Sequence, residues 1–111
     1  MEEIEFGDFS KVDFRVGEIK EAVKVEESEK LIRMIVDFGV LGEKIVFSGI
    51  YHWYKPEDIV GKKTVFVVNV KAKKIMGEES QAMIFAAEDE TEDSLSLLLL
   101  DRNVKNGSRV Y

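Results

Sequence analysis

The stretch Leu31-Ile32-Arg33-Met34-Ile35-Val36-Asp37-Phe38 carries the clearest structural pattern in the chain. Every second residue is apolar and falls on one face: Ile32, Met34, Val36 and Phe38. The opposite face mixes apolar side chains with an arginine and an aspartate. Such alternation is typical of a β-strand that buries one face. After a glycine-bounded turn over residues 39–42, residues 44–48 are expected to return as the antiparallel partner, so the sequence predicts a β-hairpin here.

Further strands are predicted on both sides of this hairpin. Upstream, residues 12–25 favour one long strand, in which Gly17 marks a bulge or bend that lets the strand serve two parts of a curved sheet. Downstream, residues 83–87 and 95–100 are expected to be buried strands. Between them and the hairpin, a second apolar face alternates with Val65, Val67 and Asn69, and it consists of Thr64, Phe66, Val68 and Val70.

A short helix is predicted between the third and fourth strands. Pro56 suits a first helical position, Glu57 and Asp58 place acids in the first turn, and Gly61 provides a stop. No internal repeat or Pro/Gly/Ser linker divides the 111 residues, so we expect residues 1–111 to form a single domain. Short strands with one intervening helix in so small a chain predict an all-β fold, a partly open antiparallel barrel of the OB type.

The composition excludes several classes of protein. With 45% hydrophobic residues and seven Phe, the chain is too apolar to be disordered, yet its apolar runs are too short for a membrane span. No basic, apolar leader opens the sequence, which predicts a cytoplasmic protein. The absence of cysteine removes thiol catalysis, disulfides and cysteine-ligated zinc together.

No residue pattern indicates catalysis, a metal ion or a cofactor. His52 is the only histidine, and Ser48 lies four residues before it without an orienting acid nearby in the sequence. The acidic run over residues 88–93 lacks the spaced ligands and central glycine of a calcium loop, so it is interpreted as a solvated turn. No glycine-rich phosphate loop is present. We therefore expect a protein that is not an enzyme.

The distribution of charge along the chain favours a nucleic-acid partner, although the net charge does not. The formal net charge is −6, which argues against nucleic acid. However, residues 59–77 contain no acid and five lysines: Lys62, Lys63, Lys71, Lys73 and Lys74. Because charges are screened beyond roughly 8 to 10 Å at physiological salt, a polyanion would respond mainly to this local excess. Lysines with an Asn before them and Ser and Gln after them suit phosphates and sugar hydroxyls, although such a loop can also be only a solvated connection.

The sequence also resembles a known family. Asp8-Phe9-Ser10-Lys11-Val12-Asp13-Phe14-Arg15-Val16-Gly17-Glu18-Ile19 is similar to the opening D-F-x-K-V-D-L-R-V-G of the tRNA-binding domain family. That family includes free-standing dimeric tRNA-binding proteins, the C-terminal domain or beta subunit of methionyl-tRNA synthetase, and a domain of the endothelial monocyte-activating polypeptide. Later blocks agree in order and spacing: Ser28-Glu29-Lys30-Leu31 with Arg33, Ser48-Gly49-Ile50, Tyr54-Lys55-Pro56-Glu57, Val60-Gly61-Lys62-Lys63, Val68-Asn69, Lys73-Lys74-Ile75, and Gly77 with Ser80-Gln81 and Met83.

The resemblance implies a five-stranded OB-fold barrel with a C-terminal extension used for dimerisation, and binding to the outside of folded tRNA without catalysis. Two arrangements stay open, a free-standing protein, which the sequence favours, and a protein that works in trans beside methionyl-tRNA synthetase. The RNA-binding residues carried over from the matching blocks are Lys30, Arg33, Ser48, Asn69, Lys73, Lys74, Ser80, Gln81 and Met83. Two positions depart from the family pattern: Ala72 replaces a common proline, and Ala82 replaces a common glycine.

Three points stay open at the level of sequence. An export-related peptide chaperone on the same dimeric scaffold is the alternative function, because relatives with this barrel are associated with secretion. A structural module with a vestigial groove is a weaker one. Tyr51, Trp53 and Tyr54 are expected to cap the open end of the barrel rather than stack on bases. The leucines over residues 95–100 exceed what one core face needs, which favours a subunit interface.

Overall fold

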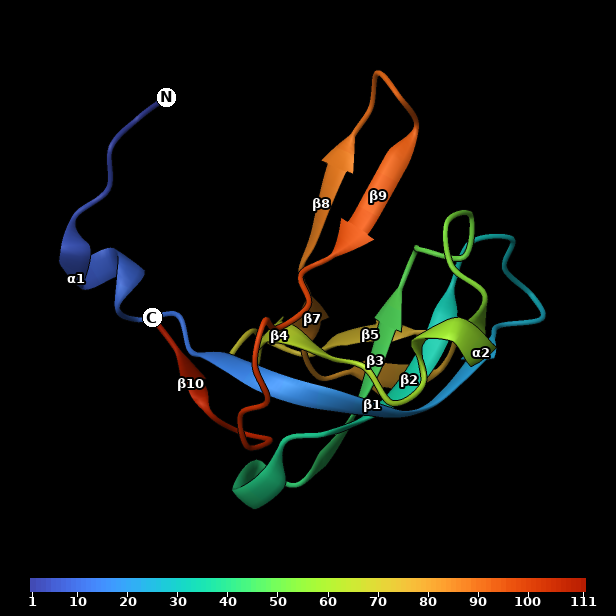
Figure 1. Ribbon diagram of the computed structural model, residues 1–111, viewed down its shortest axis with the longest axis horizontal. Coiled ribbons are helices and arrows are strands. Elements are labelled where there is room, and N and C mark those ends of the chain that lie inside the picture. Colours follow the sequence, from blue (N-terminus) through green and yellow to red (C-terminus); the bar gives the residue numbers. More distant parts are fainter.

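A computed structural model describes all 111 residues and consists mainly of strands (Figure 1). The elements in chain order are α1 (Phe6–Phe9), β1 (Phe14–Lys24), β2 (Ile32–Asp37), the 3-10 turn η1 (Gly39–Leu41), β3 (Glu43–Ser48), α2 (Pro56–Ile59), β4 (Lys63–Val67), β5 (Lys73–Ile75), β6 (Glu78–Ser80), β7 (Met83–Ile84), β8 (Ala86–Asp89), β9 (Ser94–Leu97) and β10 (Arg109–Val110). No helix has both the length and the hydrophobicity that a membrane crossing requires.

The main sheet curls into a nearly closed barrel. Its strands are hydrogen-bonded in the order β3-β2-β1-β4-β7, and β10 adds to β1. The seam between β3 and the segment after β6 is closed partly by side chains. Gln81 donates its backbone N–H to the carbonyl of Ile45 and accepts the Ile45 N–H on Oε1, both at 2.8 Å. These bonds take the place of a regular strand ladder at the seam. The strand order and this closure confirm the predicted all-β, OB-like barrel.

Strand β2 lies at the centre of the core, as its alternation predicts. The predicted inner face is completely buried: Ile32, Met34, Val36 and Phe38. The Phe38 ring meets that of Phe66 on β4 edge to face, with centroids 5.1 Å apart. Antiparallel pairing from Ile32 opposite Ser48 to Asp37 opposite Glu43 confirms the predicted hairpin. Burial of large apolar side chains at roughly 25 cal/mol per Å² is the main stabilising contribution of this hairpin.

Strand β1 pairs with three others, as one long strand serving two parts of the sheet. Its first half pairs with β4 and β10, and its second half pairs with β2. The irregularity in the ladder lies between Ile19 and Glu21 and not at Gly17, which corrects the predicted bulge position. Gly17 serves a different purpose, because a Cβ there would lie 2.6 Å from the side chains of both Phe38 and Val36. Its hydrogen allows the core to approach the backbone closely.

Helix α2 lies between β3 and β4 as predicted, with Pro56 in its first turn. Its Ile59 is completely buried, so the helix closes one end of the barrel. The next strand is shorter than its sequence pattern indicated. Thr64 and Phe66 are buried, but β4 ends at Val67, and Val70 lies in the following loop. The polar Asn69 interrupts the ladder there, since its side chain bonds to the N-terminal segment.

The C-terminal part of the chain differs most from prediction. Residues 83–87 and 95–100 do not form two buried strands. Instead β7 ends at Ile84, and β8 and β9 form a hairpin that projects from the barrel (Figure 1). All of β8 is exposed, as are Leu98 and Leu99. The acidic turn does connect two strands as expected. At the base of the hairpin, Leu97 still enters the core and Leu95 packs against it, so burial is lost only farther from the barrel and after β9.

The two ends of the chain meet beside the barrel. Helix α1 was not predicted; it stands off from the sheet next to β10 (Figure 1). β10 pairs with the start of β1, and Arg15 donates a hydrogen bond to the carbonyl of Gly107 at 3.0 Å. The predicted C-terminal extension is therefore present and returns to the first strand of the barrel.

Candidate nucleic-acid interface

A groove lies between β3 and the β5–β6 hairpin. We call it the lysine groove, and it has a volume of about 290 Å³. Five of its eight lining residues are hydrophobic, and the complete set is Phe47, Val70, Lys71, Lys73, Ile75, Ser80, Ala82 and Met83. The floor is therefore apolar, and the two lysines stand at its rim. Three of the residues predicted from sequence meet here: Lys73, Ser80 and Met83.

The groove exists because a short hairpin follows the end of β4. β5 and β6 pair in register from Lys73 opposite Ser80 to Ile75 opposite Glu78. Met76 and Gly77 both have positive φ, at 52° and 84°, which makes the tight connection between the strands. The hairpin carries Lys73 and Lys74 outward, and both are exposed. Neither they nor Lys71 takes part in any of the six ion pairs in the structure.

Unlike these lysines, Arg33 forms an ion pair. Its guanidinium donates two hydrogen bonds to the Glu78 carboxylate, from Nε at 2.7 Å and from the second terminal nitrogen at 2.9 Å. This fork holds the pKa of Glu78 below its usual 4.5 and raises the pKa of Arg33. Because Arg33 is on β2 and Glu78 on β6, the pair ties the hairpin to the barrel wall. In the structure the Glu78 carboxylate already accepts two hydrogen bonds from the Arg33 guanidinium, and the contact of Arg33 with RNA phosphate stays a prediction.

Three more predicted residues are engaged in internal hydrogen bonds. Buried Ser80 accepts the Phe47 N–H on Oγ at 3.0 Å, and Gln81 makes the two bonds to Ile45 that close the barrel. Asn69 accepts the Asp13 N–H at 2.8 Å and donates to the carbonyl of Lys11 at 2.6 Å. These side chains satisfy backbone groups at places where strands do not pair. Their predicted RNA contacts stay predictions.

The remaining predicted residues are more accessible. Lys30 is exposed, and its aliphatic stem lies beside Gly49. Ser48 ends β3 and makes no side-chain hydrogen bond within the chain, unlike Ser80. Met83 is 56% exposed at the rim of the lysine groove. Six of the nine predicted residues do not line the groove: Lys30, Arg33, Ser48, Asn69, Lys74 and Gln81.

Comparison with known proteins places this geometry in a family. The model of a putative tRNA binding domain matches residues 14–109, from the first residue of β1 to the first residue of β10. The chain belongs to the tRNA-binding domain family. The expected relationship is thus confirmed over almost all of the chain.

The relatives of this tRNA-binding domain include a much longer ligase and solved chains that it covers completely. Methionine–tRNA ligase of Methanocaldococcus jannaschii is 46% identical over 110 residues, which are 99% of this chain and 17% of the ligase. The domain therefore spans about a sixth of that curated relative. A MetRS related protein from Pyrococcus horikoshii superposes with a TM-score of 0.92 at 40% identity, and each chain is covered completely. The chaperone CsaA of Bacillus anthracis has a TM-score of 0.88 at 31% identity, over 99% of this chain and all of that one.

Sequence reasoning missed several groove residues of the tRNA-binding domain. Phe47 and Ile75 form part of its floor, and Val70 lies at its edge. The sequence pattern places Phe47 and Val70 in strands and Ile75 in the basic loop, and an apolar side chain in either gives no indication of whether it faces the core or a groove. Lys71 was noted as part of the basic segment and was not included among the predicted contacts. Its position two residues before Lys73 was a usable indication, because alternate residues of an extended chain share a face.

The aromatic cluster of the tRNA-binding domain packs on the barrel, as the sequence favoured. Tyr51, Trp53 and Tyr54 are partly buried against the core. Trp53 Nε1 donates to the carbonyl of Asp93 at 3.2 Å, and the Tyr54 hydroxyl accepts the Leu97 N–H at 3.1 Å. These bonds anchor the projecting β8–β9 hairpin. The rings are thus engaged in holding the hairpin, not displayed as a free stacking surface.

The single histidine has an acidic partner but no nucleophile. His52 Nε2 lies 2.9 Å from Asp93 Oδ2, and this hydrogen bond holds the pKa of Asp93 below 3.8. Ser48 forms no hydrogen bond with His52, so no Ser–His pair is assembled. No group of three or more His, Asp or Glu side chains converges in a way that would hold a metal ion.

Proposed function

We propose that this domain binds the outside of folded tRNA through the lysine groove, without catalysing a reaction. The observation that carries the proposal is the combination of an apolar floor with Lys71 and Lys73 at the rim, both free of carboxylate partners. Ammonium groups attract phosphates whatever the sequence, and an apolar floor accommodates ribose and base surfaces. Membership of the tRNA-binding domain family supports the same ligand.

The acidic net charge is compatible with this proposal. The β8–β9 turn, with its acids, projects away from the barrel (Figure 1). On the β5–β6 hairpin itself, Glu78 is held by Arg33, and Glu79 lies opposite Lys74 in the ladder, but neither Lys73 nor Lys74 forms an ion pair. At physiological salt, charges more than roughly 8 to 10 Å away are largely screened. RNA docked at the groove therefore responds chiefly to the local lysines. A cytoplasmic location belongs to the same proposal.

The test is a competition titration of the purified protein with folded tRNA, unstructured RNA and an unfolded polypeptide. We expect folded tRNA to bind best, and its affinity to fall steeply as salt rises. The variant Lys73→Glu, Lys74→Glu is expected to abolish binding. The matched control is Lys44→Glu, Lys55→Glu, which makes the same charge change at two lysines that do not line the groove and is expected to retain most of the affinity. Equal loss in both variants, or tRNA binding that is insensitive to salt, contradicts the proposal.

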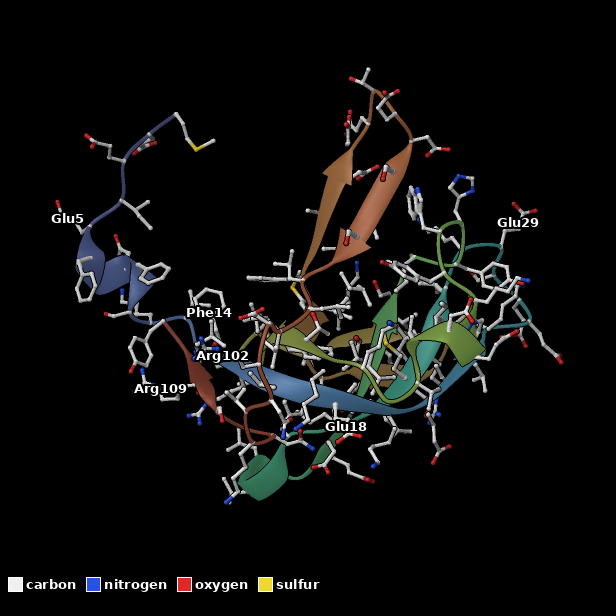
Figure 2. The ribbon with its side chains drawn as sticks, viewed as in Figure 1. Glu5, Phe14, Glu18, Glu29, Arg102 and Arg109 are labelled. Carbon is white, nitrogen blue, oxygen red and sulfur yellow. The ribbon has the colours of Figure 1, made fainter.

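We further propose that the domain is a homodimer. An apolar cavity of about 240 Å³ lies where the two ends of the chain meet, and its lining is entirely hydrophobic: Phe9, Phe14, Val65, Phe85, Leu98, Val110 and Tyr111. We call this surface the terminal face. The ring of Phe14, labelled in Figure 2, lies between those of Phe9, tilted with centroids 5.7 Å apart, and Phe85, edge to face with centroids 5.4 Å apart. Contiguous exposed apolar surface of this kind marks an interface, and two-fold symmetry is the commonest way to cover it.

Sedimentation equilibrium tests the homodimer. Phe6 and Tyr111 are 79% and 97% exposed, so Phe6→Glu with Tyr111→Glu leaves the monomer intact while placing charge in the interface. We expect this variant to sediment as a monomer. Val40→Glu, at a side chain 88% exposed in the η1 turn, is the control and should remain dimeric. A dimeric double variant, or a monomeric wild type, refutes the terminal face as the interface.

Methionyl-tRNA synthetase is the proposed partner in trans. A domain 46% identical to part of a methionine–tRNA ligase would hold tRNA beside an enzyme that lacks such a segment. Two grooves in one dimer would also bind one tRNA with a gain in effective concentration. Co-sedimentation of the domain with the synthetase of the same organism, with and without tRNA, tests this partnership.

A peptide chaperone is the second candidate function. It is favoured by the superposition with the chaperone CsaA and by the apolar floor of the groove. On this hypothesis the unfolded polypeptide wins the competition, salt has little effect, and Met83→Ser at the groove rim weakens binding more than the lysine changes do.

A further inference from the structure

The fold divides the basic segment of the sequence between two places. Lys62 and Lys63 precede the body of β4, whereas Lys71 and Lys73 come after it and line the lysine groove. β4 has five residues, which at about 3.3 Å per residue separate its ends by roughly 13 Å. The first two lysines therefore lie outside the groove.

Lys62 and Lys63 line a second cleft. It has a volume of about 340 Å³ and lies between residues 61–63 and residues 99–103. Its lining includes three cations, Lys62, Lys63 and Arg102, and a single anion, Asp101. The lining contains no aromatic ring and only two hydrophobic residues, so it offers neither a base-stacking platform nor an apolar pocket for a small molecule. We call it the second basic cleft.

Lys63 holds the two walls of the cleft together through hydrogen bonds. Its ammonium donates to Asn103 Oδ1 at 2.9 Å and to the carbonyl of Val104 at 2.8 Å, which fixes the segment after β9 against the start of β4. Glu18, labelled in Figure 2, faces the same lysine from β1. The pKa of Glu18 is lowered, first by its hydrogen bond from Asn106 and to a smaller extent by Lys20 and Lys63. Lys63 is therefore already engaged.

Lys62 and Arg102 are available. Lys62 forms no ion pair or side-chain hydrogen bond. Arg102, labelled in Figure 2, is paired only with the adjacent Asp101, at 3.7 Å and with side chains 90% and 96% exposed. Exposed pairs of this kind contribute little and exchange readily with another anion. Two cations on long side chains thus flank an open cleft whose walls are fixed.

We propose that the second basic cleft binds the phosphodiester backbone of the RNA held in the lysine groove, through Lys62 and Arg102. This inference rests on the proposed function and extends it to a second contact on the same protomer. Cations without base-reading or stacking groups suit phosphates, which position a nucleic acid without specifying its sequence. An additional contact of this kind also fits recognition of a folded RNA by its shape.

The experiment measures the affinity for folded, unfractionated tRNA over a range of salt concentrations. Each phosphate contact adds about 0.7 to 0.9 to the magnitude of the slope of log affinity against log salt. Lys62→Ala with Arg102→Ala is therefore expected to make that slope shallower by about 1.4 to 1.8. The control Lys44→Ala with Lys55→Ala removes two lysines that line neither site and should leave the slope within experimental error.

The charge-preserving variant Lys62→Arg with Arg102→Lys should restore the wild-type slope, which separates loss of charge from loss of structure. A double-alanine slope equal to that of the control overturns the second site while leaving the lysine groove in place. A wild-type protein that does not bind tRNA overturns the proposed function itself, and this inference with it.

Discussion

Ser80→Ala tests whether a residue expected to touch RNA acts instead on the barrel. The Ser80 side chain is almost completely buried, and its Oγ accepts the Phe47 N–H at 3.0 Å. Alanine removes the acceptor and leaves a buried N–H without a partner, which costs about 1–3 kcal/mol of folding free energy. For a domain of this size roughly 4 °C of Tm accompanies each kcal/mol, so we expect a fall of about 4–12 °C.

Urea unfolding at a fixed protein concentration measures the free energy, because a dimer gains apparent stability with concentration. Ser48→Ala is the matched control, since the Ser48 hydroxyl makes no bond within the chain, and we expect its stability to change by less than about 0.5 kcal/mol. tRNA affinity is then measured well below the unfolding transition. A Ser80→Ala protein of unchanged stability that loses tenfold or more in tRNA affinity refutes the structural assignment.

Three further predictions follow from other contacts. Glu78→Gln releases the Arg33 guanidinium beside the lysine groove, so tRNA affinity at low salt is expected to rise roughly two- to fivefold in a filter-binding assay; a fall would mean that the ion pair positions the hairpin. Gly17→Ala brings a Cβ within 2.6 Å of the packed core, and urea unfolding should show a loss of about 1–3 kcal/mol. The hydrogen bond from His52 lowers the pKa of Asp93 in the folded state, so its stabilising contribution is present above pH 3.8 and is lost as pH falls through the depressed value. NMR titration of His52→Ala should return the pKa of Asp93 towards 3.8, and an unchanged pKa would exclude this cause.

Local patterns predicted those parts of the fold that depend on local physics. The alternation over residues 31–38 identified the buried face of β2, because side chains on a strand have a period of two. Pro56 and Gly61 identified the ends of α2 for a similarly local reason. The burial predicted for residues 83–87 and 95–100 is correct for Leu97, which lies in the core, and wrong for β8, Leu98 and Leu99. Whether leucines enter a core depends on where the strand goes, and here Leu98 and Leu99 leave the barrel.

In the candidate site, too, local sequence predicted some features, and others depended on the three-dimensional fold. Exposed lysines were predicted well, because a run of cations has no place in a core. The roles of Asn69, Ser80 and Gln81 were beyond sequence reasoning. An amide or hydroxyl bonds equally well to RNA and to an unpaired backbone group, and the gaps in the β-ladder that these side chains fill exist only in three dimensions. α1 has four residues, too few for a helical period to be visible.

The pairing of β10 with β1 has a consequence for biosynthesis. Phe14 and Arg15 find their β10 partners only at residues 109–110, and Arg15 finds its carbonyl at Gly107. During translation the first strand therefore leaves the ribosome long before its outer neighbour has been made. Until then its exposed edge invites pairing with other nascent chains. Crowding of several nascent chains on one message favours such wrong pairing, and a translational pause before the codons of residues 109–110 would prolong that exposure.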